Sequence, residues 1–66
     1  MTNSIIPEVM TAAMETIGQH YANKMIEQGL NPTKEEIAQA MQNNWEKVSQ
    51  EIASLYAESI ELLRAA

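Results

Sequence analysis

Apolar residues recur at helical spacing through the first part of the chain. The row that they form is Ile6, Met10, Ala13, Ile17 and Tyr21. Positions three or four apart share one face of an α-helix, so this row indicates an amphipathic helix. Pro7 is tolerated in the first turn of such a helix, and Gly29 is the type of residue that ends one. We therefore predict a helix over residues 5–28.

A second helix is predicted from a start signal and a heptad pattern. Thr33 followed by Glu36 matches the capping box, in which each side chain bonds the backbone amide of the other residue. Beyond them, apolar positions alternate three and four residues apart at Ala38, Met41, Trp45, Val48, Ile52, Leu55, Ser59 (the one polar member) and Leu62. The pattern predicts one helix over residues 33–64.

The alternative is a break near residues 42–44, where Gln42, Asn43 and Asn44 are adjacent. Asn44 would then cap a third helix beginning at Trp45, and the chain would be a monomeric three-helix bundle. The unbroken heptad phase across these residues favours the single long helix, because a loop normally resets the register.

Taken together, the patterns predict an all-α protein with one domain over residues 1–66, a long two-helix hairpin. A chain of 66 residues buries little core, and no cysteine is present to supply a disulfide. A second apolar row (Tyr56, Ile60 and Leu63) widens the face of the second helix, so we expect two hairpins to dimerise into a four-helix bundle. The residues expected at a dimer or partner interface are apolar and aromatic: Met10, Met14, Ile17, Tyr21, Met41, Trp45, Val48, Ile52, Leu55, Tyr56, Ile60, Leu62 and Leu63.

Charge narrows the choice of partner. Nine acidic and four basic side chains give a net charge of −5, which disfavours direct binding to nucleic acid or to an anionic membrane and favours a basic protein partner. The first four residues carry no positive side chain, and the short apolar pair Ile5 and Ile6 is followed by Pro7. We therefore expect neither a signal peptide nor a membrane-spanning helix, and a cytoplasmic location.

Candidate catalytic chemistry is sparse. His20 is the single histidine, and we interpret it as a surface residue in preference to a base or a pH switch. No cysteine and no metal-ligand spacing occur, and the glutamates spread over several faces of the second helix. We expect no enzyme activity, no metal and no cofactor. Trp45 is the one large aromatic anchor, at home either in a core or at an interface.

Two short stretches resemble known families. The segment 32–38, Pro-Thr-Lys-Glu-Glu-Ile-Ala, is similar to part of the helix-turn-helix segments of bacterial sigma factors, although it is equally explained as a helix start. The segment 48–52, Val-Ser-Gln-Glu-Ile, resembles the Ser-Gln-Glu-Leu-Asp motif of the helical-hairpin phosphatases that act on sporulation response regulators. That resemblance implies a phosphatase, but Ala53 stands where the family has its functional aspartate.

The leading functional hypothesis is a non-enzymatic homodimeric helical module that binds another protein, as an adaptor, inhibitor or small regulator. Two alternatives remain open. One is an acidic mimic of nucleic acid that inhibits a basic DNA- or RNA-binding protein, and the other is a phosphatase-like hairpin without the motif aspartate.

Overall fold

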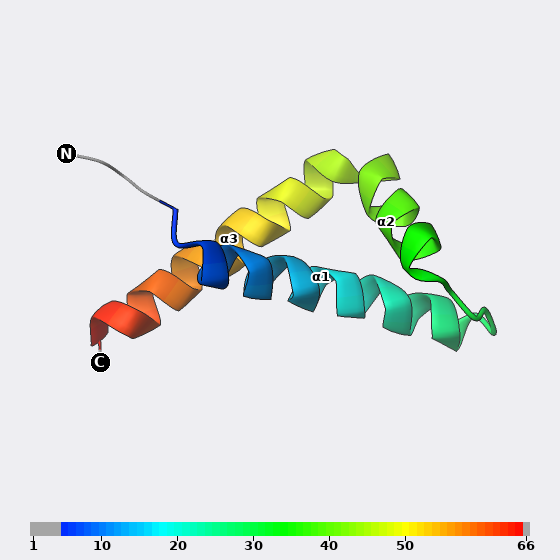
Figure 1. Cartoon of the computed structure of the whole chain (residues 1–66), viewed down its shortest axis with the longest axis horizontal. Helices are drawn as coiled ribbons and strands as arrows, with labels where there is room; N and C mark the ends of the chain where they lie inside the picture. The colour runs from blue at the N-terminus through cyan, green and yellow to red at the C-terminus, as the bar shows by residue number, and fades with distance from the viewer. Residues whose placement is uncertain (1–4, 66) are drawn as a thin grey trace.

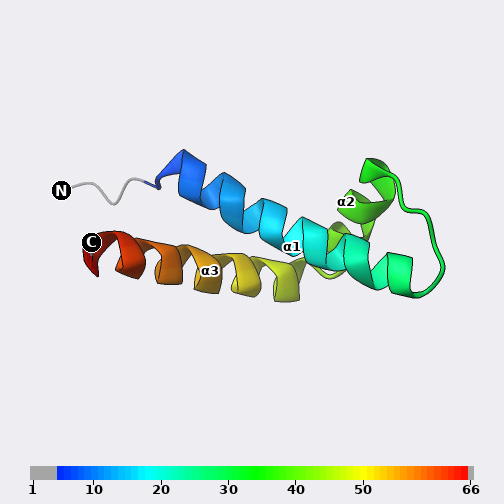
Figure 2. The same cartoon turned by 90° about the horizontal axis from the view of Figure 1, so that it is seen from below.

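The computed structural model describes residues 5–65, and this part of the chain forms three α-helices and no strand. They are α1 (Pro7–Glu27), α2 (Lys34–Asn43) and α3 (Trp45–Ala65). The two long helices, α1 and α3, cross and run in opposite directions, and the short α2 links the C-terminal end of α1 to the N-terminal end of α3 (Figures 1 and 2). All three pairs of helices are in contact, α1 and α3 most extensively. The prediction of an all-α protein is confirmed.

The first helix follows the predicted pattern closely. Ile6 occupies the N-cap position with extended backbone, and Pro7 begins the helix. At the other end, Gly29 has a φ of +84°, and its amide donates to the carbonyl of Ile26 at 2.9 Å. The amide of Leu30 donates to the carbonyl of Met25 at 3.0 Å. These two bonds form a Schellman ending, which explains why α1 stops where glycine allows a left-handed residue.

The predicted capping box is confirmed at the start of α2. The amide of Glu36 donates to Thr33 Oγ1 at 3.2 Å, and the amide of Thr33 donates to Glu36 Oε1 at 2.8 Å. Each bond satisfies an amide that the helix start would otherwise leave without a partner. The turn between α1 and α2 is therefore fixed by short-range chemistry at both of its ends.

The prediction of one continuous helix over residues 33–64 is wrong, and the alternative break near residues 42–44 is confirmed. Asn44 lies between α2 and α3 with φ −118° and ψ 34°, outside helical geometry. Its backbone amide donates to the carbonyl of Met41 at 3.2 Å, and its side-chain Nδ2 donates to the carbonyl of Ala40 at 3.0 Å. Asn44 therefore tightens the last turn of α2 and supplies, from its side chain, the bond to Ala40 that a continuing helix would make.

The break divides the predicted heptad. Its central members remain inside, with Val48 and Ile52 buried and Met41 packed against them. In α2, however, the inward positions are shared by Ile37 and Ala40, which are half-buried, whereas the heptad position Ala38 is exposed. An unbroken heptad pattern therefore does not exclude a break. The turn at Asn44 directs α2 toward α1, while the apolar spacing continues along the sequence.

The buried core is small. In residues 5–65 it contains Ala13 and Ile17 from α1 and Val48 and Ile52 from α3. Met10, Tyr21, Met41 and Leu55 pack around these four. The core therefore lies between the two long helices, and α2 contributes Met41 at its edge.

The molecule is extended for its size. Its Cα radius of gyration is 13.7 Å, whereas a compact domain of this length has about 11 Å. The chain exposes 5352 Å² of surface, against about 4200 Å² for a compact monomer of this mass. The difference is roughly 1100 Å².

Candidate protein-binding surface

An apolar groove runs between α1 and the first half of α3, and we name it the Trp45 groove. Its volume is about 250 Å³, and its walls carry no charged residue: Met10, Met14, Trp45, Ser49, Ile52 and Ala53. Two of its largest side chains are open to solvent, since Met14 is 44% exposed and Trp45 is 52% exposed. An uncharged concave surface with an exposed tryptophan is typical of a site that buries an apolar group from another molecule.

The break at Asn44 places Trp45 in this groove. Trp45 is the first residue of α3, and within the single chain it lies outside the buried core formed by residues such as Val48. In a continuous helix, Trp45 would instead pack in the same apolar row as the other heptad residues. Here the preceding helix bends away toward α1, and Trp45 is left 52% exposed.

Two hydroxyl groups beside the Trp45 groove are already bonded within the chain. The hydroxyl of Ser49 donates to the carbonyl of Glu46 at 3.0 Å. Farther along α3, the hydroxyl oxygen of Tyr56 accepts from the amide of Ile6 at 2.8 Å, which ties the start of α1 to α3. Because these groups have partners, covering this side of α3 would strand neither hydroxyl without a hydrogen bond.

A second apolar groove lies near the C-terminal end of α3. It has a volume of about 370 Å³ and is lined by Glu8, Val9, Ala12, Ser59, Leu62 and Leu63. Leu62 is 73% exposed, the highest value among the exposed large apolar side chains of residues 5–65. Unlike the Trp45 groove, this groove contains a carboxylate, that of Glu8. It lies between the first turns of α1 and the C-terminal part of α3.

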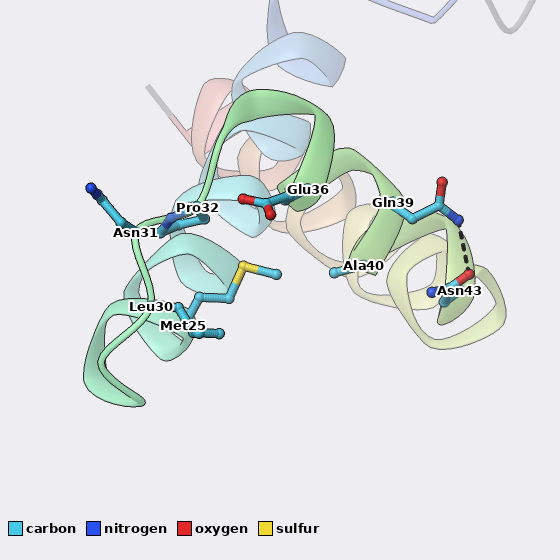
Figure 3. A pocket seen from close by; sticks show the side chains of 8 residues that line it. All are labelled: Met25, Leu30, Asn31, Pro32, Glu36, Gln39, Ala40 and Asn43. Atoms are coloured by element: carbon cyan, nitrogen blue, oxygen red, sulfur yellow. Dashed lines mark hydrogen bonds between the residues drawn. The ribbon is translucent and has the colours of Figure 1, made fainter.

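A third hollow lies where the hairpin turn meets α2 (Figure 3). It has a volume of about 340 Å³ and is lined by Met25, Leu30, Asn31, Pro32, Glu36, Gln39, Ala40 and Asn43. Its polar groups hold the local structure: Glu36 belongs to the capping box, and Gln39 Nε2 donates to Asn43 Oδ1 at 3.1 Å. These groups explain the shape of the turn and supply no organised catalytic set.

A more polar groove brings His20 together with residues of α3. It has a volume of about 620 Å³, and its lining includes Thr16, His20, Lys47 and Glu51. The sequence pattern did not indicate that His20 and Glu51 line one groove, because they belong to different helices. Within residues 5–65, no group of three histidine or carboxylate side chains is placed to hold a metal ion.

The structure separates the thirteen residues predicted at an interface into three sets. Ile17, Val48 and Ile52 are buried in the core of the single chain. Six others are partly buried, namely Met10, Tyr21, Met41, Leu55, Tyr56 and Ile60. The four exposed members are Met14, Trp45, Leu62 and Leu63.

Two small residues of the Trp45 groove were missing from the predicted set. Ser49 and Ala53 line the groove beside Trp45, and a selection of large apolar residues passes over both. Their helical phase was the available signal, since Trp45, Ser49 and Ala53 follow one another at intervals of four residues.

Comparison with known protein families, with curated proteins and with solved structures found no match. Within the described residues, none of the helices combines the length and apolar character needed to cross a membrane.

Proposed function

We propose that this protein is a non-enzymatic protein–protein interaction module that acts as a homodimer and buries the Trp45 groove in its interface. The observation that carries the proposal is the groove itself, an uncharged apolar hollow that leaves Trp45 and Met14 about half exposed. Tryptophan is among the residue types that are enriched at the positions contributing most to binding energy between proteins.

The energy available at Trp45 is large for so small a protein. A tryptophan side chain buries about 150–250 Å², and apolar burial is worth roughly 25 cal/mol per Å². Because 52% of Trp45 is exposed, burying this exposed part in an interface would contribute about 2–3 kcal/mol. Within residues 5–65 the folded chain has a core of four buried residues, so an interface of this kind would add substantially to the stability of the folded chain.

Size and charge support a second copy as the partner. Each protein in a standard interface contributes about 800 Å², and the surface in excess of a compact monomer is of that order. Each copy has a net charge of −5, but the lining of the groove contains no charged residue. Two like-charged molecules can therefore meet at this surface without burying opposed carboxylates.

Sedimentation velocity across the micromolar range tests the proposal. The unaltered protein should sediment as a dimer, and Trp45→Ala should dissociate at least about tenfold more readily, the equivalent of losing roughly 1.4 kcal/mol. Leu62→Ala is the control, because Leu62 is also an exposed apolar residue but lines the other groove. A compact monomer at every concentration would contradict homodimerisation. A dimer equally weakened by both substitutions would contradict the choice of groove.

A further inference from the structure

We infer that the two copies pair with their α3 helices antiparallel, so that Glu46 of each copy lies against the partner's Arg64. This inference rests on the proposed homodimer and specifies its geometry. It is carried by the arrangement of charged and uncharged residues along the side of α3 that borders the Trp45 groove.

Glu46 and Arg64 lie on the same side of α3, at its two ends. The interval between them corresponds to about five full turns of helix, or roughly 27 Å. Both side chains are exposed. One side of the helix is therefore bounded by a negative charge near its N-terminus and by a positive charge near its C-terminus.

The row between these two charges is uncharged. It passes through Ser49, Ala53, Ala57 and Ile60, which follow Glu46 at helical spacing. Ser49 and Ala53 are walls of the Trp45 groove, so the row and the groove form one continuous surface. The small side chains allow another helix to approach closely, and the hydroxyl of Ser49 is already bonded to the carbonyl of Glu46 at 3.0 Å.

Twofold symmetry then distinguishes two orientations. In a parallel pair, Glu46 would face the partner's Glu46 and Arg64 would face the partner's Arg64, which places like charges together at both ends. In an antiparallel pair whose twofold axis crosses α3 at the level of residue 55, each Glu46 faces the partner's Arg64. The antiparallel pair also opposes the two helix dipoles and satisfies the self-complementarity that an isologous dimer requires.

The same register places complementary apolar groups together. Trp45 of one copy comes within two residues, or about 3 Å along the helix axis, of the level of the partner's Leu63, and both side chains are more than half exposed in the single chain. The indole ring would thus cover the end of the partner helix. This contact accounts for an exposed apolar residue at each end of α3.

Charge reversal tests the orientation. In an antiparallel dimer, Glu46→Arg or Arg64→Glu alone turns both end contacts repulsive, and each should raise the dissociation constant several-fold. The double variant E46R/R64E restores the pairing and should return the constant to within about twofold of the original, since a factor of two is a small energy on the affinity scale. The controls are Glu58→Arg and Lys47→Glu, because both residues are exposed and lie on the other side of α3. Circular dichroism of each variant confirms that the helices remain folded.

The outcomes separate the orientation from the dimer itself. Loss in both single variants with recovery in the double variant supports the antiparallel pair. A dimer that tolerates both single variants, or that the double variant weakens further, overturns the orientation and leaves the proposed homodimer standing. An unaltered protein that is monomeric throughout overturns both.

Discussion

The two glycines of the chain have opposite structural requirements. Gly29 has a φ of +84°, a backbone conformation that other residues adopt only with strain, although no atom lies within 4 Å of the position that a Cβ would take. Gly18 lies inside α1, and an added Cβ there would meet Met41 Sδ at 3.8 Å, an ordinary contact. The backbone conformation at residue 29 therefore requires glycine, whereas the helical conformation at residue 18 does not.

This difference gives a matched pair of substitutions. Gly29→Ala should lower the free energy of unfolding by about 1–2 kcal/mol, because alanine is strained in a left-handed conformation. Gly18→Ala should raise it by about 0.5–1 kcal/mol, because alanine is the better helix former. Urea denaturation followed by circular dichroism at a fixed protein concentration measures both. A loss of stability in Gly18→Ala would mean that α1 and α2 cross more tightly than the 3.8 Å contact indicates.

Val48 is the most deeply buried of the four core residues. Its side chain is 0% exposed and packs with Ile52, Ala13 and Ile17. Val48→Ala should lower the free energy of unfolding by about 2 kcal/mol, from lost burial and from the cavity that remains. Gln50→Ala is the control, since Gln50 is exposed on the same helix. The same urea experiment measures both variants, and an equal effect in the two would show that Val48 is not enclosed as the structure describes.

At the scale of the helices, local sequence signals were reliable where the side chain and the backbone it bonds are close together. The capping box at Thr33 and the ending of α1 at Gly29 are of this kind, and the structure contains both. The break at Asn44 was harder to predict, because apolar spacing alone does not register a side chain that replaces a backbone hydrogen bond. The bond from Asn44 Nδ2 to the carbonyl of Ala40 is the feature that the heptad pattern could not reveal.

The sequence pattern predicted only part of the candidate site. Large apolar residues such as Met14 and Trp45 were recognisable from composition and phase, and they lie in the groove. Whether each residue faces the core or the solvent depends on the direction of α2, which the turn at Asn44 sets. The sequence pattern therefore placed Ile17 and Trp45 in one interface, whereas the structure buries Ile17 and leaves Trp45 about half exposed.

The start of α2 allows the capping interaction to be measured directly. Thr33→Ala removes the oxygen that accepts from the amide of Glu36 and should lower the free energy of unfolding by about 1 kcal/mol. Thr16→Ala is the matched control, because the hydroxyl of Thr16 donates to the carbonyl of Ala12 within α1 and caps no helix start. That variant should be neutral or slightly stabilising, since alanine is the better helix former. Equal losses in the two variants would contradict a special role for the capping box.

At the scale of the whole molecule, folding and association are expected to be linked. The single chain has a core of four buried residues in its described part, and its radius of gyration of 13.7 Å is that of an open arrangement of helices. Chains of this length are marginally stable unless another interaction supports them. An interface that buries Trp45 would supply that interaction, so the folded chain should depend on its own concentration.

This dependence can be measured without any substitution. For a dimer that dissociates as it unfolds, a roughly hundredfold dilution removes about 2.7 kcal/mol of apparent stability. The Tm of the unaltered protein, followed by circular dichroism, should therefore fall by several degrees over that dilution. Trp45→Ala, which removes the exposed side chain of the groove, should have a lower Tm than the unaltered protein at each concentration, because its dimer dissociates more readily. If the unaltered protein melts at one temperature at all concentrations, its three helices are stable without a partner and the exposed groove is not covered by a second copy.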